Sequence, residues 1–131
     1  MKNIQDLLDR FEAFKLKGLQ LNEQDLHDRL SLWDDINDAV IELESKFLEG
    51  DATYDRDYGL RLIELKEIKD SEGKKRYTDA TAKAMCDNEF FDRYLDLIVI
   101  KETYKRLMKK AELIEPYTNV VKLHIRKDFS I

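Results

Sequence analysis

Few residues in this chain have the types and spacing that catalysis or metal binding requires. His27 is followed by Asp28, a pair that occurs in metal-dependent phosphohydrolases, but such sites need further His and Asp ligands. The only other histidine in the sequence is His124, near the C-terminal end. A site with both histidines would require the C-terminal segment to fold back onto the helix that carries His27. We therefore interpret both as surface residues and expect no metal site.

The acidic residues and the single cysteine do not indicate catalysis either. Asp34, Asp35 and Asp38 cluster on a predicted helix; acidic pairs can hold Mg²⁺, but a solvated helix face is the simpler interpretation. Cys86 is followed by Asp87, and nearby acids raise a thiol's pKa, which disfavours a reactive thiolate. The four glycines are scattered, so no phosphate-binding loop is present. We predict that the protein is not an enzyme, with no catalytic residues and no cofactor.

The chemistry that the sequence does support is binding through basic side chains near the C-terminal end. Eight of them face only three acids: Lys101, Lys105, Arg106, Lys109, Lys110, Lys122, Arg126 and Lys127. On a helix, Lys101, Lys105 and Lys109 share one side, where cations could neutralise nucleic-acid phosphates. Alternatively, they stabilise the C-terminal half of the helix through its dipole, or pair with an acidic protein surface. The net charge of −5 disfavours a dedicated duplex binder.

Charge is distributed unevenly along the chain. Residues 1–58 contain 15 acidic and 7 basic side chains, whereas residues 59–131 contain 13 acidic and 16 basic ones. Such a dipolar chain could stack head to tail with other copies, or hold its two ends against different partners.

Helices must position these residues, because the composition leaves little room for strands. Charged residues make up 39% of the chain and hydrophobic ones 43%, with only four glycines and one proline. A chain of 131 residues is large enough to bury a core as one domain. We predict an all-α fold, an antiparallel bundle of four to five helices with one long C-terminal helix.

Local signals place the boundaries of these helices. The first helix is short and ends at Gly18, and the second is capped by Asn22 or Asp25 and ends at Gly50. A third helix follows and ends at a polar turn around Gly73, after which a short alanine-rich helix begins. The short connections favour antiparallel neighbours, so the second, third and last helices should pack up-down-up.

The longest helical pattern runs from Asn88 to Glu115 and is predicted to end at Pro116. Its apolar and aromatic residues recur at spacings of three and four, and residues 97–100 are apolar on every side. A helix that is apolar all round is normally covered by neighbours on more than one side. We therefore expect this helix to be the central element of the bundle.

The pattern changes after Pro116. Val121, Leu123 and Ile125 alternate with polar residues, the period of two expected of a strand. The predicted domains are thus a helical bundle over 1–116 and an extended arm or tail over 117–131, with the three apolar residues as a candidate arm interface. Three interpretations fit: an arm in a groove of its own bundle, an arm added to another chain as a strand, or a frayed tail or last short helix.

No secretory signal or transmembrane segment is expected, so we predict a cytoplasmic protein. In style the chain resembles the small helical proteins of tailed bacteriophages, through a capped alanine-rich helix that leads into a long one over residues 77–110. The resemblance implies a virion assembly or connector component, or an accessory factor. The location would then be the host cytoplasm or the virion. It transfers no site residue.

These observations favour a non-enzymatic interaction or assembly protein that acts within an oligomer or larger complex. The alternative is a nucleic-acid-binding accessory protein that uses the basic helix face. A third hypothesis is an acidic inhibitor of a host nucleic-acid enzyme, in which the acidic N-terminal half imitates a polyanion and charge reversal at Asp34, Asp35 and Asp38 should abolish inhibition. We expect a protein partner or self-association, no membrane, and no small-molecule substrate.

Overall fold

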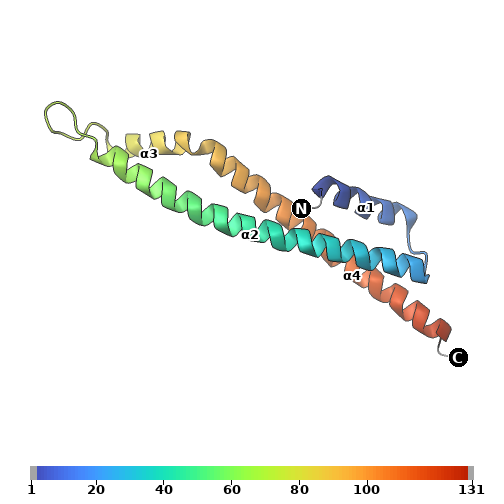
Figure 1. Cartoon of the computed structure of the whole chain (residues 1–131). Coiled ribbons are helices and arrows are strands. Elements are labelled where there is room, and N and C mark those ends of the chain that lie inside the picture. The colour runs from blue at the N-terminus through green and yellow to red at the C-terminus, as the bar shows by residue number, and fades with distance from the viewer. Residues whose placement is uncertain (1–2, 130–131) are drawn as a thin grey trace. The chain divides into compact units, whose positions relative to one another are not determined.

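The computed structural model describes residues 3–129, with side chains as far as Arg126, and is helical through most of that range. It contains α1 (Ile4–Lys17), α2 (Glu23–Glu67), α3 (Asp79–Glu89) and α4 (Phe91–Phe129), labelled in Figure 1. Within these residues strand-like pairing is limited to one isolated bridge between Lys69 and Lys75. The all-α prediction is confirmed.

Both ends of α1 are capped, and its end at Gly18 is the one that the sequence predicts. The Asn3 side chain accepts a hydrogen bond from the Gln5 N–H at 2.9 Å. Gly18 ends the helix with a φ of 73°, a backbone conformation that favours glycine, and its N–H donates to the Phe14 carbonyl.

The N-terminus of α2 was also predicted correctly, but its length was not. The Asn22 side chain accepts from the Asp25 N–H at 2.8 Å and caps the helix. From there α2 continues for 45 residues, through Gly50 and Gly59. The predicted helix end at Gly50 is therefore wrong, and the second and third expected helices are one.

The role of Gly50 explains this difference. A glycine inside a helix costs only about 1 kcal/mol relative to alanine, which packing can outweigh. The apolar pattern keeps its phase across the glycine, from Phe47 to Tyr54. A Cβ at position 50 would lie 2.8 Å from Cδ2 of Leu97, so glycine here permits a close approach of α4. The residue is a contact point between two helices.

The loop between α2 and α3 is the polar turn expected from the sequence. The Asp70 carboxylate accepts hydrogen bonds from the N–H groups of Glu72 and Lys74, and Gly73 adopts a φ of 79°. Thr78 then caps α3.

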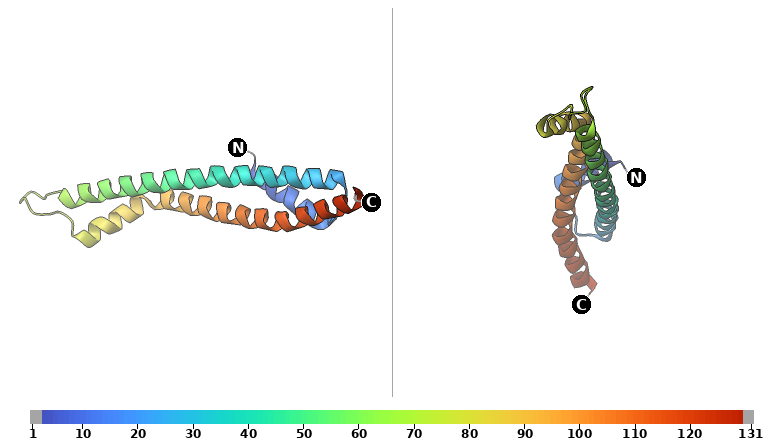
Figure 2. Two further views of the ribbon diagram at one scale, coloured as in Figure 1. Left: turned by 90° about the horizontal axis from the view of Figure 1, so that it is seen from below. Right: turned by 90° about the vertical axis from the view of Figure 1, so that its left-hand side faces the viewer.

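A single residue, Phe90, separates α3 from α4. The Phe90 N–H donates to the Cys86 carbonyl, and the Phe90 carbonyl accepts from the Tyr94 N–H, both at 3.0 Å. Hydrogen bonding thus passes through the junction while the helix direction changes, and Figure 2 shows α3 inclined to the first turns of α4.

α4 does not end at Pro116, and no extended arm follows it. Pro116 lies inside the helix, which continues to Phe129, so the prediction of an extended conformation after Pro116 is wrong for residues 117–129. Ile114, Thr118 and Val121 are buried at spacings of four and three, and the Thr118 hydroxyl donates to the Ile114 carbonyl at 3.0 Å. Burial of this helical stripe outweighs the backbone hydrogen bond that proline cannot make.

The chain divides into two compact units. Unit 1 comprises Met1–Glu44 and Glu102–Ile131, and unit 2 comprises Ser45–Lys101. Unit 1 buries apolar side chains from three helices: Leu7, Leu8 and Phe11 of α1, Leu32, Ile36, Ala39 and Leu43 of α2, and Leu107, Ile114 and Val121 of α4. Unit 2 has a smaller core of Leu65, Ala82 and Cys86, edged by partly buried Tyr58, Leu62, Ile68, Tyr77, Met85 and Phe90.

The apolar run of α4 predicted that neighbours would cover this helix on more than one side. In the structure, part of it remains exposed. In unit 2, Val99 is 64% exposed, and Phe91 is 54% exposed. The reason is the number of neighbours: the contacts of this segment are with α2, at Gly50, Asp57 and Phe47, and one helix covers only one side of it. The expected up-down-up set of three helices does not form, since two of its members are the single helix α2.

Candidate interaction surfaces

Ion pairs and one phenol hold the helices of unit 2 together. Arg61 of α2 forms a two-point contact with Glu89 of α3, with Nε–Oε2 and Nη2–Oε1 distances of 2.8 and 3.0 Å. Arg93 of α4 lies 3.0 Å from the carboxylate of Asp57 on α2. The hydrogen bond from Arg61 lowers the pKa of Glu89, and the one from Arg93 lowers the pKa of Asp57.

An aromatic cluster lies in the same contact region between α2, α3 and the start of α4, which we call the seam. Tyr54 packs against Tyr58 with a centroid distance of 5.8 Å, and both meet the edge or face of Phe90 at 5.7–5.8 Å. The Tyr58 hydroxyl donates a hydrogen bond to Asp87. This bond, with burial and the charge of Asp87, raises the pKa of Tyr58 to about 12. These aromatic residues pack α2 against Phe90 and so stabilise unit 2.

Cys86 is part of this seam and is not a reactive thiol. It is buried, and its Sγ lies 3.6 Å from the Tyr58 carbonyl, to which it donates. Burial raises the pKa of the Cys86 thiol, and Glu89 and Asp87 raise it further. The expected effect of the neighbouring acids is confirmed.

Another side of α4 in unit 2 is apolar and more exposed, although Tyr94 at its edge also packs against Tyr54 of α2 with a centroid distance of 6.4 Å. Phe91, Tyr94, Leu95 and Ile98 follow one another at spacings of three, one and three, which places them on one face of the helix. All four side chains are more than a third exposed. We call these residues the outer stripe. On α2, Leu48, Leu60 and Ile63 are also exposed within unit 2.

The predicted basic residues are divided between the two units. Lys101 belongs to unit 2, where its ammonium lies 6.0 Å from the Phe47 ring. Lys110 belongs to unit 1, where it lies 4.4 Å from the centroid of the Phe11 ring and 3.5 Å from the Glu12 carboxylate.

The remaining basic residues of α4 lie in unit 1. Lys105, Arg106 and Lys109 are exposed and occupy adjacent positions on the helix. Further along, Lys122 is half-buried and Arg126 is exposed. The side chain of the other candidate, Lys127, lies outside the described residues.

The three candidate interface residues of the expected arm have different environments on α4. Val121 is fully buried in unit 1, Ile125 is half-buried, and Leu123 is 57% exposed. On a helix, residues 121 and 123 point in directions about 200° apart, because successive residues turn by about 100°. They therefore do not form the single face that a strand would give.

The acidic residues do not form a metal site among the residues that the structure describes, where no group of three His, Cys, Asp or Glu side chains is close enough to hold an ion. Asp35 pairs with Arg10 of α1 at 2.7 Å, which joins α1 to α2 in unit 1. The cluster formed by Asp34, Asp35 and Asp38 thus includes one residue with a structural contact.

Sequence reasoning missed a buried ion pair in unit 1. Asp25 is fully buried and Arg29 is only 5% exposed. The Arg29 Nε donates to Asp25 Oδ2 at 2.7 Å, its Nη2 donates to the Gly18 carbonyl at 2.9 Å, and its guanidinium stacks on Phe14. The spacing of four between the acid and the base is the signal in the sequence that points to this pair.

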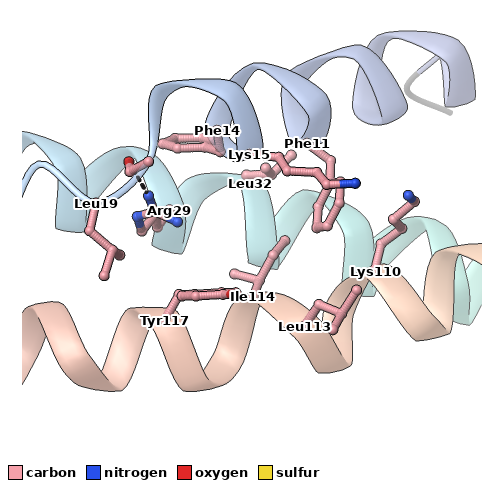
Figure 3. A pocket seen from close by; sticks show the side chains of 11 residues that line it. Phe11, Phe14, Lys15, Leu19, Arg29, Leu32, Lys110, Leu113, Ile114 and Tyr117 are labelled. Carbon is pink, nitrogen blue, oxygen red and sulfur yellow. Dashed lines mark hydrogen bonds between the residues drawn. The ribbon is translucent and has the colours of Figure 1, made fainter.

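A pocket of about 420 Å³ adjoins this pair, between α1, α2 and α4 within unit 1. Figure 3 shows the side chains that line it. They are Phe11, Phe14, Lys15, Gly18, Leu19, Arg29, Leu32, Lys110, Leu113, Ile114 and Tyr117. The lining is mostly apolar, with three cations and no acid.

The chain matches no protein-family model, and no curated protein or solved structure is similar enough to assign it to a family. Between residues 3 and 129, no helix combines the length and the apolar character needed to cross a bilayer. The surfaces described above are therefore the basis for inferring a function.

Proposed function

We propose that this protein is a non-enzymatic helical assembly protein that self-associates through unit 2. The observation that carries the proposal is the outer stripe, an apolar face on α4 whose four side chains remain more than a third exposed, although Tyr94 also packs against Tyr54 of α2. Contiguous exposed apolar residues on a helix are typical of protein interfaces.

The outer stripe remains exposed because unit 2 contains few packed helical segments. Two packed helical segments bury only the faces that they turn toward each other, so further apolar faces remain in water unless another layer covers them. Burying a Leu, Ile or Phe side chain completely is worth about 1.5–3 kcal/mol, and each residue of the outer stripe has already gained part of this. Covering four such residues from each of two copies is a sufficient driving force for association.

A second copy is the partner that this surface fits best. Two-fold dimers are the commonest oligomers, and they bring the same patch of each copy together. Two copies of unit 2 joined in this way would form an antiparallel helical bundle, the architecture that the sequence pattern favours. A virion assembly or connector role, implied by the resemblance to phage proteins, is part of the same proposal.

The test is the molar mass in solution, measured by light scattering. We expect the wild-type chain to be a dimer or larger, and the variant with Leu95→Glu and Ile98→Glu to be a monomer with unchanged helix content by circular dichroism. The matched control is Leu16→Glu with Leu123→Glu, which places the same charge on two leucines of unit 1 that are 88% and 57% exposed. A monomeric wild type, or a double variant that keeps its mass, would rule out this interface.

A second candidate function is nucleic-acid binding through Lys105, Arg106 and Lys109. The observation that favours it is that these exposed cations form no ion pair with a described residue, whereas Lys110 is engaged by Glu12. Phosphate binding by these side chains predicts salt-dependent affinity, and the variant with Lys105→Glu and Lys109→Glu should bind more weakly and lower the salt slope by about 2. No binding of single- or double-stranded DNA or RNA at low ionic strength would exclude this function.

A further inference from the structure

We propose that the pocket of unit 1 binds a small molecule with an apolar body and one carboxylate, such as a medium-chain fatty acid. The inference is independent of the proposed self-association, because every residue that lines the pocket belongs to unit 1 and the outer stripe belongs to unit 2. The pocket volume of about 420 Å³ lies within the range of small-molecule sites in proteins.

Three helices supply the apolar walls. Phe11 comes from α1 and Leu32 from α2, and both are buried, so this side of the pocket is set by the core of unit 1. Leu113 and Tyr117 come from α4 and are each 52% exposed. An apolar ligand between these walls would remove the exposed side chains from water, which is the main source of affinity in such sites.

The cationic side chains that line the pocket indicate that the other end of the ligand is an anion. The charge of Arg29 is already neutralised by Asp25. Its Nε donates to Asp25 and its Nη2 donates to the Gly18 carbonyl, so these groups are already engaged. Lys15 is exposed and forms no ion pair with a described residue. The lysines are therefore the groups available to an anion.

Both lysines serve the same end of the pocket. Lys15 follows Phe11 by one helical turn on α1, and Lys110 lies 4.4 Å from the centroid of the Phe11 ring. Figure 3 shows the two lysine side chains directed to the end of the pocket beside Phe11. The contact from Lys110 to Glu12 is 3.5 Å long, and the Glu12 side chain is 52% exposed, so the contact holds the lysine weakly. A carboxylate placed here would lie between two ammonium groups, with its apolar chain along the aromatic wall.

The experiment is a titration of the full chain with decanoate, followed by NMR of the methyl groups of Leu113 and Ile114. Decanol, which has the same apolar body without the charge, is the matched ligand. We expect saturable shifts of both methyl groups with decanoate and binding by decanol at least about tenfold weaker, the loss expected for a charge-assisted contact. Absence of saturable shifts with decanoate, or equal binding by the two ligands, overturns the proposal.

Variants separate the pocket from the rest of the surface. Lys15→Gln with Lys110→Gln should weaken decanoate binding about tenfold or more and leave decanol binding unchanged. Lys105→Gln with Lys109→Gln removes the same charge from exposed positions outside the pocket and should change neither. Leu113→Trp, at a half-exposed wall position, should block both ligands. Full binding by either pocket variant contradicts the site, whereas Leu95→Glu with Ile98→Glu should bind decanoate like the wild type.

Discussion

The hydroxyl of Tyr58 on α2 donates a hydrogen bond to the carboxylate of Asp87 on α3, joining two helices that are separated in the chain by a polar loop. Lys83, one turn earlier on α3, also contacts this carboxylate at 3.2 Å. The bond from Tyr58, together with Lys83, lowers the pKa of Asp87, while the pKa of Tyr58 is raised. Unit 2 is thereby stabilised by groups that respond to both alkaline and acidic pH.

The alkaline response follows from Tyr58. Its pKa rises from 10.0 in the unfolded chain to about 12 in the fold, so the stabilisation is complete below pH 10 and is lost as the pH rises toward 12. We expect Tyr58→Phe to be less stable than wild type at neutral pH and to lose less stability over this range. In a pH titration followed by tyrosinate absorbance, the wild type has six tyrosines, and the step at the highest pH should be missing in the variant. If Tyr117→Phe, a change in unit 1, has the same effect, the assignment is wrong.

The acidic response follows from the pair of Arg61 and Glu89. The pKa of Glu89 is lowered from 4.5, so its stabilisation is present above pH 4.5 and disappears as the pH falls through the folded pKa. Glu89→Gln should therefore lower the unfolding midpoint at neutral pH but not in strong acid. Glu67→Gln, at an exposed position of α2, is the control. A deficit that is independent of pH would contradict the ion-pair explanation.

The two glycines inside α2 should respond differently to alanine. Nothing lies within 4 Å of a Cβ at Gly59, so Gly59→Ala should stabilise the chain by about 0.5–1 kcal/mol through helix propensity. At Gly50 the same gain is opposed by the contact with Leu97, whose side chain must move. We expect a smaller gain for Gly50→Ala and a clear loss for Gly50→Ile, measured by urea unfolding. Equal gains at both positions would show that the helices do not approach closely here.

Because the chain after Pro116 is helical, residues close in sequence differ in how deeply their side chains are buried. Val121 is fully buried, so Val121→Ala should cost about 1–3 kcal/mol by leaving a cavity. Leu123 is 57% exposed, so Leu123→Ala should change stability by no more than about 0.5 kcal/mol. Urea unfolding of the two variants tests this directly, because an extended arm with both residues on one face would make the two changes similar.

Breaking the ion pair of Asp25 and Arg29 by changing one partner should cost more folding stability than replacing both residues with apolar ones. Among the described residues, Asp25 Oδ1 has no hydrogen-bond partner, so Arg29 supplies the main compensation for this buried charge. Arg29→Met should destabilise unit 1 by about 3–5 kcal/mol. The double change with Asp25→Leu should recover much of that loss, because it leaves no unpaired charge. A double variant less stable than Arg29→Met would show that the ion pair itself is the favourable arrangement.

Local signals in the sequence determined the helical class and most of the helix ends. Gly18 was identified correctly as a helix end, and Asn22 was one of the two predicted caps of α2, because capping depends on side chains and backbone within a few residues. The positions of the basic residues on one helix could also be read from their spacing, since the helical period is constant.

Tertiary structure decided what the local signals left open. Gly50 and Pro116 both have the local character of helix ends, yet packing against Leu97 in one case and burial of Val121 in the other keep the helix continuous. The candidate surfaces were equally out of reach: periodicity gives an apolar residue a direction around its helix, but not a neighbour on that side. Whether Ile98 is core or surface, and whether Lys110 faces solvent or Phe11, depends on how many helices pack there, which is a property of contacts distant in sequence.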